Sequence, residues 1–169
     1  MDFTDADLIF SLKESLSIEQ ETPTVEEIAS ILPAKFASVK VTKTETRRVY
    51  ATVPREDIFA VCTYIHDNLT FEHCTTLLGV DYVDHMSVVY HLSNYYNGVM
   101  IELVVDVPVD DLHVESVTSI WEGANWHERE TWELFGIVFD NHPKLERLLT
   151  PETYEFFPFR KSYKLRGSE

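Results

Sequence analysis

The chain has 169 residues, of which 44% are hydrophobic, and its 29 acidic and 14 basic side chains give a net charge of −15. This length suits one globular domain with a sizeable core, and the acidic balance argues against a broad basic surface for nucleic acid or anionic lipid. The longest apolar run is far shorter than the roughly 20 residues of a membrane helix, so we expect any membrane contact to go through a partner.

The two cysteines, Cys62 and Cys74, lie outside any Cys-x-x-Cys or Cys/His spacing. Zinc and iron–sulfur ligation are therefore not predicted, and no cofactor is expected to be bound by this chain. Free thiols without a recognisable signal peptide favour a reducing compartment.

Residues 1–36 form an acidic extension in which the apolar spacing predicts two short helices. The first covers 2–16. The second starts near Thr24, where a proline and two acids mark a helix N-terminus, and Pro33 is expected to end it.

Two alternating, β-branched runs at 39–43 and 47–53 predict the first two strands. Pro54 then opens a helix whose apolar residues recur at helical spacing, as expected for a helix packed on a sheet. These residues are Ile58, Val61, Cys62, Ile65 and Leu69, and the position of Cys62 among them predicts a core residue rather than a reactive thiol.

Three further strands are predicted at 71–82, 86–93 and 99–107, and they follow one another as an antiparallel meander. Gly79 suggests a β-bulge in the first of them. Asn97 followed by glycine favours a type I′ hairpin between the second and the third.

The segment 112–124 is expected to form a second sheet-covering helix that runs into a charged helix beginning near Trp126. The order β-β-α-β-β-β-α therefore predicts an α+β sandwich with a mixed or antiparallel sheet, helices on one sheet face and an extended C-terminal tail. We divide the chain into the N-terminal extension at 1–36, a core domain at 37–141 and a basic, aromatic tail at 142–169.

The charged helix is the densest cluster of functional groups in the chain. Glu128, Arg129, Glu130 and Glu133 occupy little more than one turn, with Arg129 and Glu133 at the i,i+4 spacing of an ion pair. Phe135 precedes a glycine that can supply the positive φ of a helix end. Such a density of charge and aromatic groups predicts a surface that fits a partner.

The tail differs in charge from the rest of the chain. Residues 142–169 carry 6 basic and 4 acidic side chains, whereas 1–141 carry 8 and 25. Arg160 and Lys161 could pair with acidic groups of a partner while the neighbouring proline and aromatic side chains fill apolar pockets. The alternative is that the same side chains fold back onto the chain's own acidic surface.

Catalytic motifs are scarce. Glu130 and Glu133 could form a general acid/base pair, but no nucleophile or glycine-rich phosphate cradle accompanies them. The seven histidines form no His-x-x-x-His pattern, and His142 is expected to brace its own turn. A charge-paired structural helix is the interpretation favoured by these residues.

The stretch 128–149 reads Glu-Arg-Glu-x-x-Glu-Leu-Phe-Gly-Ile-x-Phe-x-x-His-Pro-x-Leu-x-Arg-Leu-Leu, and Thr-Pro-Glu-Thr-Tyr (150–154) and Pro-Phe-Arg-Lys-Ser-Tyr (158–163) follow it. This pattern resembles the signature of the thirty-kilodalton subunit family of complex I, with relatives in deazaflavin-coenzyme dehydrogenases and membrane-bound hydrogenases. The resemblance covers about 38–165 and is strongest in the last forty residues. The chain departs from the pattern at Glu133, where aspartate is usual, at Lys144, where aspartate or asparagine is usual, and at Phe157, where histidine is frequent.

The resemblance implies a non-catalytic scaffold subunit in the peripheral arm, on the cytoplasmic side of the membrane. It would brace the quinone-site large subunit and the small iron–sulfur subunit, and the iron–sulfur clusters would lie in those neighbours. The complex would transfer electrons from NADH, reduced deazaflavin coenzyme or ferredoxin to a quinone or methanophenazine, coupled to ion translocation. The implied subunit-interface residues are Glu128, Arg129, Glu130, Glu133, Phe135, Gly136, His142, Pro143, Arg147, Pro158, Arg160, Lys161 and Tyr163.

Three alternatives remain open at the level of sequence. The chain could be a subunit of a related membrane-bound hydrogenase. It could instead be a stand-alone enzyme that uses Glu130 and Glu133 as an acid/base pair, or a free-standing binding or regulatory domain with its tail ordered against its own surface.

Overall fold

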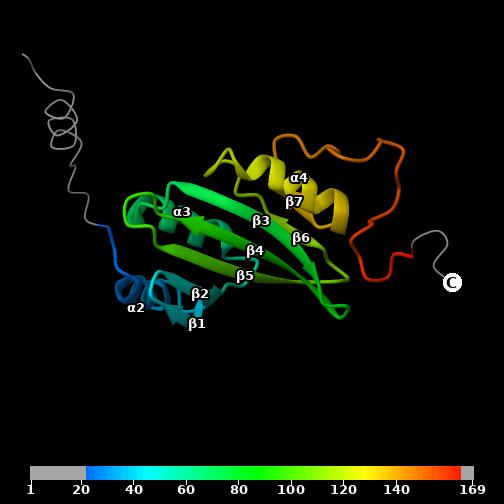
Figure 1. Ribbon diagram of the computed structural model, residues 1–169. Coiled ribbons are helices and arrows are strands. Elements are labelled where there is room, and N and C mark those ends of the chain that lie inside the picture. Colours follow the sequence, from blue (N-terminus) through cyan, green and yellow to red (C-terminus); the bar gives the residue numbers. More distant parts are fainter. Residues whose placement is uncertain (1–21, 165–169) are drawn as a thin grey trace, which may run out of the picture.

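The computed structural model describes residues 22–164 and has an α+β architecture in which one twisted sheet carries helices on one face (Figure 1). This confirms the predicted fold class. The elements, labelled as in Figure 1, are α2 (Val25–Lys35), β1 (Lys40–Glu45), β2 (Arg48–Thr52), α3 (Ile58–Leu69), β3 (His73–Asp81), β4 (His85–Ser93), β5 (Met100–Pro108), β6 (His113–Glu115), α4 (Ala124–Phe135) and β7 (Val138–Asp140).

The main sheet has five strands in the order β1-β2-β5-β4-β3. Strands β3, β4 and β5 are antiparallel neighbours, as the predicted meander requires. Strand β2 lies parallel to β5, so residues 48–52 pair with 100–104 and the sheet is mixed. The crossover from β2 to β3 passes through α3.

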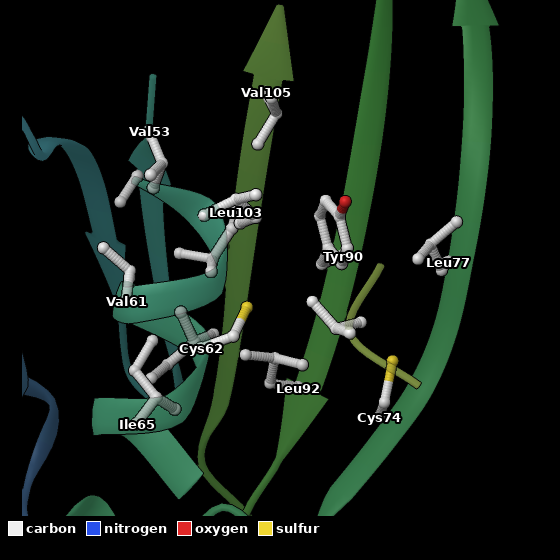
Figure 2. Close-up of a cluster of buried hydrophobic side chains, with 14 of the residues drawn as sticks. Val53, Val61, Cys62, Ile65, Cys74, Leu77, Tyr90, Leu92, Leu103 and Val105 are labelled. Atoms are coloured by element: carbon white, nitrogen blue, oxygen red, sulfur yellow. The ribbon is translucent and has the colours of Figure 1, made fainter. Parts of the chain in front are cut away.

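The core lies between this sheet and α3, as Figure 2 shows. Apart from Ser87, which is also buried, alternate residues of β4 and β5 are buried because side chains in a strand point to opposite faces. Tyr90 and Leu103, which are register partners, face Cys62 on α3. The predicted apolar stripe of α3 is wholly buried, and both Cys62 and Cys74 are free, buried thiols, so the prediction that Cys62 is a core residue is confirmed.

Helix α2 adds to the same core. Thr24 and Glu27 form a reciprocal capping box at its start, and Val25, Ile28 and Leu32 are buried. The prediction that Pro33 ends this helix was wrong, because Pro33 lies inside it. The helical hydrogen bonding continues to the C-cap, where the backbone N–H of Phe36 donates to the carbonyl of Leu32. The helix predicted at 2–16 lies outside the described residues.

The predicted helix at 112–124 was also wrong. Residues 113–115 form β6, which pairs in parallel with β7, and turns follow up to the start of α4. The apolar positions Val114, Val117 and Trp121 are all buried, but a strand and a turn bury them rather than a helix face. The segment is extended because its backbone bonds to β7 and to a carboxylate of α4.

Gly79 marks close packing rather than a bulge. It stays in register with Val88, and the irregularity of β3 lies between Cys74 and Thr76. A Cβ atom at Gly79 would lie 2.8 Å from the ring of Phe135 and 3.0 Å from the methyl group of Thr131. The absent side chain therefore lets α4 lie directly on β3.

The loop between β4 and β5 is wider than the predicted type I′ hairpin. A type I′ turn needs positive φ at both central residues, but in this loop only Gly98 has it, at +68°. The Asn94 side chain accepts the backbone N–H groups of Tyr96 and Asn97 and so organises a longer connection.

Candidate functional site: the charged helix and its tail

Glu128 lies in the interior rather than on the outer surface of α4. Its side chain is fully buried, and one carboxylate oxygen accepts the hydroxyls of Ser116 (2.6 Å) and Thr118 (3.0 Å). The other oxygen accepts the backbone N–H of Val117 at 2.8 Å. Burial raises the pKa of Glu128 to about 7, against the opposing effect of these three donors. Glu128 thereby ties the segment between β6 and α4 to the helix.

His142 packs beside this carboxylate, with 4.0 Å between its Nε2 and an oxygen of Glu128. Its Nδ1 accepts the backbone N–H of Lys144 at 3.0 Å, and its Nε2 faces the carbonyl of Asn125 at 3.3 Å. An acceptor on one ring nitrogen and a donor on the other describe a neutral imidazole. Burial also lowers the pKa of His142. The prediction that His142 braces its own turn is confirmed.

Glu133 holds the start of the tail. Its buried carboxylate accepts the backbone N–H groups of Leu148 (2.7 Å), Leu149 (3.0 Å) and Thr150, together with the Thr150 hydroxyl. Burial opposes its ionisation, but these hydrogen bonds outweigh that cost and hold the pKa of Glu133 below its usual value. Three successive N–H groups around one carboxylate form a compact anion nest within the chain.

Arg129 does not form the predicted ion pair with Glu133. Its guanidinium donates to the carbonyls of Glu146 (2.8 Å) and Arg147 (3.2 Å) and lies over the ring of Trp126. The i,i+4 pair fails because the Glu133 carboxylate is already occupied by the tail backbone. Both side chains thus hold the same tail segment from one helix.

The C-terminal end of α4 receives the far part of the tail. Gly136 ends the helix with φ +81°, as predicted. Arg160 donates from Nε to the carbonyl of Phe135 at 2.6 Å, and its guanidinium stacks on the ring of Phe157. A Cβ atom at Gly136 would clash with that guanidinium, so the glycine also makes room for Arg160. A cation here is favourable because the last carbonyls of a helix carry partial negative charge.

Further contacts continue along the tail. The backbone N–H of Phe159 reaches the carbonyl of Leu134 at 3.1 Å, and that of Lys161 reaches a carboxylate oxygen of Asp81 at 2.8 Å. Tyr163 shares a hydrogen bond with the hydroxyl of Tyr154. Residues 142–164 of the tail therefore contact their own chain, mainly through backbone hydrogen bonds and the Arg160 side chain, while the side chains of Phe159 and Lys161 stay exposed.

The other predicted interface residues occupy the edges of this arrangement. Arg147 lies between the rings of Trp132 and Tyr154, Pro158 is half-buried, and Glu130 and Pro143 are exposed. Large apolar side chains around them are exposed: Phe156 is 60% and Phe159 61% exposed, and Trp126 and Leu149 are exposed as well.

This geometry offers little to an acid/base reaction. Glu133 is buried and fully hydrogen-bonded, whereas Glu130 is exposed, so the two carboxylates do not face a common substrate position. Among residues 22–164, no group of three His, Cys, Asp or Glu side chains is placed to hold a metal ion. No helix in the same range is long and apolar enough to cross a membrane.

Comparison with known proteins identifies the family. Residues 51–169 match the family described as the respiratory-chain NADH dehydrogenase 30-kDa subunit. The chain belongs to this family.

Two curated relatives show how far the family likeness extends. The C subunit of the F(420)H(2) dehydrogenase of Methanosarcina mazei is 40% identical over 119 residues, which cover 69% of this chain and 75% of that protein. The C subunit of the NADH-quinone oxidoreductase of Geobacter metallireducens is 37% identical over 141 residues, covering 80% and 87%.

Two solved structures share the fold of this 30-kDa-family chain. A fragment of Nqo5 superposes with a TM-score of 0.62 at 28% identity, covering 71% of this chain and 98% of the fragment. A chain of the archaeal membrane-bound sulfane sulfur reductase gives 0.75 at 23% identity, covering 83% and 86%, and at that identity it supports the fold alone. The protein is accordingly a subunit of a complex I-like membrane complex, and its partners are other subunits of such a complex.

Several residues of the site were not predicted. Ser116 and Thr118, which hold Glu128, lie in the segment mistaken for a helix. Asp81 accepts a hydrogen bond from the tail at Lys161, 80 residues later in the sequence, so no local sequence pattern predicts this contact. Phe157 departs from the family pattern, and its ring is the surface on which Arg160 stacks.

Proposed function

We propose that this chain is a non-catalytic scaffold subunit in the peripheral arm of its complex, on the cytoplasmic side of the membrane. It braces the quinone-site large subunit and the small iron–sulfur subunit and binds no cofactor itself. The clusters lie in those neighbours, and the chain's task is to keep the distances between redox centres fixed.

The observation that supports this role is the ordered tail with uncovered aromatic side chains. Glu133 and Arg160 fix the tail at two points of α4, while Phe156 and Phe159 stay about three-fifths exposed. Exposed aromatic groups on a rigid backbone are typical of interface anchors, because little conformational entropy is lost when a partner covers them. We propose that the buried residues of the predicted interface set shape the tail, and that the exposed ones meet the partner together with Phe156 and Phe159, which were not in that set.

The electron donor and acceptor are determined by the other subunits of the complex. The named relatives use two donor types, NADH and reduced F420. We propose one of these or ferredoxin as the donor, with a quinone or methanophenazine as acceptor and coupled ion translocation. A related membrane-bound hydrogenase is the alternative host complex.

The test is a gentle-detergent pull-down of a tagged chain from its native membranes, with mass spectrometry of the co-purified subunits. We expect a large quinone-site subunit and a small iron–sulfur subunit, and the donor-side subunits identify the electron source. A variant with serine at both Phe156 and Phe159 should recover several-fold less of them with an unchanged melting temperature. Tyr95→Ser is the matched control, because Tyr95 is also an exposed aromatic residue but lies at the other end of the sheet.

Recovery of the chain alone, without iron, would contradict the scaffold role. Turnover by the purified chain that is lost on Glu130→Gln would establish the stand-alone enzyme instead.

A further inference from the structure

The hairpin between β3 and β4 ends in a backbone conformation that its sequence does not favour. Residues 82–84 connect the strands, and the backbone N–H of Tyr82 bonds to the carbonyl of His85 at 3.0 Å, which leaves Val83 and Asp84 as the two central residues of the turn. Val83 has φ +81°, whereas Asp84 is not among the positive-φ residues. A two-residue turn with positive φ only at its first position is of the II′ kind, in which glycine is preferred there.

A valine at this position is less favourable than a glycine, although its backbone N–H donates to the Asp81 carboxylate at 2.7 Å. Its branched Cβ clashes with the backbone when φ is positive, so the residue is strained. Burial does not compensate, because Val83 is 71% exposed. The neighbouring Tyr82 and Val109 are also exposed, and the three make an apolar tip at one end of the sheet.

The tip is continuous with the tail. Asp81, at the end of β3, accepts the backbone N–H of Lys161, and the Lys161 ammonium lies 6.0 Å from the centre of the Tyr82 ring. Figure 1 shows the end of the β3–β4 hairpin beside the last described residues of the tail, drawn in red. The tail and the hairpin tip thus lie next to each other.

The charges around the tip indicate the chemistry of its partner. Asp84 and Asp106 are exposed, and within residues 22–164 the one basic side chain within 4.0 Å of their carboxylates is His85, at 3.0 Å and 3.8 Å. Such carboxylates repel anionic lipid and attract lysine or arginine. A protein surface with an apolar pocket and a basic rim is complementary to the tip.

We propose that the β3–β4 tip, with Val83 at its apex, inserts into an apolar pocket with a basic rim on a neighbouring subunit of the complex. The burial of Val83 there offsets the backbone strain that the free chain bears. This proposal rests on the proposed scaffold role, since the partner is a subunit of the same complex.

Two substitutions at one position separate strain from contact. Val83→Gly removes both the strain and the side chain, whereas Val83→Ser removes the apolar group and keeps a Cβ. We expect Val83→Gly to raise the melting temperature of the full-length chain and Val83→Ser to leave it unchanged or lower it. Each variant should bind the complex about tenfold less well, the loss expected when a buried valine contact is removed.

The affinity is measured by competition in cells that express a wild-type and a variant chain with different tags. The ratio of the two chains in the purified complex, divided by their ratio in the lysate, gives the relative affinity. Tyr95→Ser should compete equally with wild type. Equal competition by either Val83 variant, or a lower melting temperature for Val83→Gly, would overturn the proposal.

Two further outcomes locate a failure. If the Phe156 and Phe159 double variant is outcompeted but the Val83 variants are not, the tip proposal fails and the scaffold role stands. If neither set is depleted, the scaffold role fails as well. Flotation of the chain with vesicles of phosphatidylcholine and phosphatidylglycerol, lost on Val83→Ser, would replace the protein pocket by a membrane surface and overturn the proposal.

Discussion

At the scale of single residues, α4 carries two buried glutamates that titrate in opposite directions. Both accept several hydrogen bonds, but Glu128 has a raised pKa and Glu133 a lowered one. Around Glu128 the cost of burial prevails. Around Glu133 the three tail N–H groups and a hydroxyl prevail, because together they stabilise the charge more than burial destabilises it. The same residue type on the same helix therefore responds to pH with opposite sign.

For Glu128 the folded pKa of about 7 lies above the ordinary glutamate value of 4.5. The folded state therefore binds the proton more tightly than the unfolded state, and this stabilisation is complete at low pH and is lost as the pH rises through 7. Glu128→Gln stays uncharged. As the pH rises from 5 to 8, we expect the unfolding free energy of the variant minus that of the wild type to increase by about 3 kcal/mol. Urea denaturation at several pH values measures this difference, and a pH-independent difference would contradict the raised pKa.

For Glu133 the sign is reversed, since the folded pKa lies below the usual value. Its contribution is present near neutral pH and is lost as the pH falls through the folded pKa. We expect Glu133→Gln to lower the unfolding free energy at pH 7 by about 3 kcal/mol, because charge-assisted hydrogen bonds to a buried group are lost. The matched control is Glu130→Gln on the exposed side of the same helix, which should change stability by less than about 0.5 kcal/mol in the same denaturation assay.

At the scale of elements, the sequence correctly predicts the helices and strands whose hydrophobic periodicity matches the face that is buried in the folded chain. The stripe of α3 and the alternation of β4 and β5 were recognised because period and burial coincide. The segment 112–124 was misassigned because Val114, Val117 and Trp121 have helical spacing, while their environment is decided by β7 and Glu128. Of the candidate site, the helix and its glycine end were predictable, but the role of each carboxylate depended on partners 10 to 17 residues away.

The contact between α4 and β3 leads to a prediction about Gly79. Alanine there places a Cβ against Phe135 and Thr131, and neither ring nor helix can move without disturbing the tail. We expect Gly79→Ala to cost about 1–3 kcal/mol of stability by overpacking. Gly123→Ala is the control, because nothing lies within 4 Å of the place its Cβ would take, and it should be neutral or slightly stabilising. Thermal unfolding compares the two, and equal melting temperatures would rule out this close packing.

At the scale of the whole molecule, the tail joins parts of the chain that are distant in sequence. Its fixed points are Glu133 and Phe135 on α4 and Asp81 on β3. Composition predicted an aromatic tail that needs a surface, but it did not show that the first surface would be the chain itself. Contacts that span 80 residues leave no periodic signal, so only the folded structure reveals them.

The anchoring by Arg160 can be tested without the complex. Arg160→Gln removes the ion-like contact with the carbonyl of Phe135 and the stacking on Phe157. We expect chymotrypsin to cleave within 154–163 about tenfold faster, since local opening would cost roughly 1.4 kcal/mol less. The core should remain intact in the same digest. Lys164→Gln, at an exposed tail position, serves as control, and equal cleavage of the two variants would argue against the anchor.

The parallel pairing of β2 with β5 has a consequence for the order in which the chain folds. Strand β2 can pair with β5 only after residues 100–104 have been synthesised, whereas β3, β4 and β5 pair with strands that are adjacent in the sequence. Closing a long loop costs conformational entropy before the contacts between its ends can form. We therefore expect the β3–β4–β5 meander to nucleate folding and the β1–β2 hairpin to pair with it later. Until then β5 has an open edge, and a nascent chain stalled at that stage would be most prone to pair with another copy of itself.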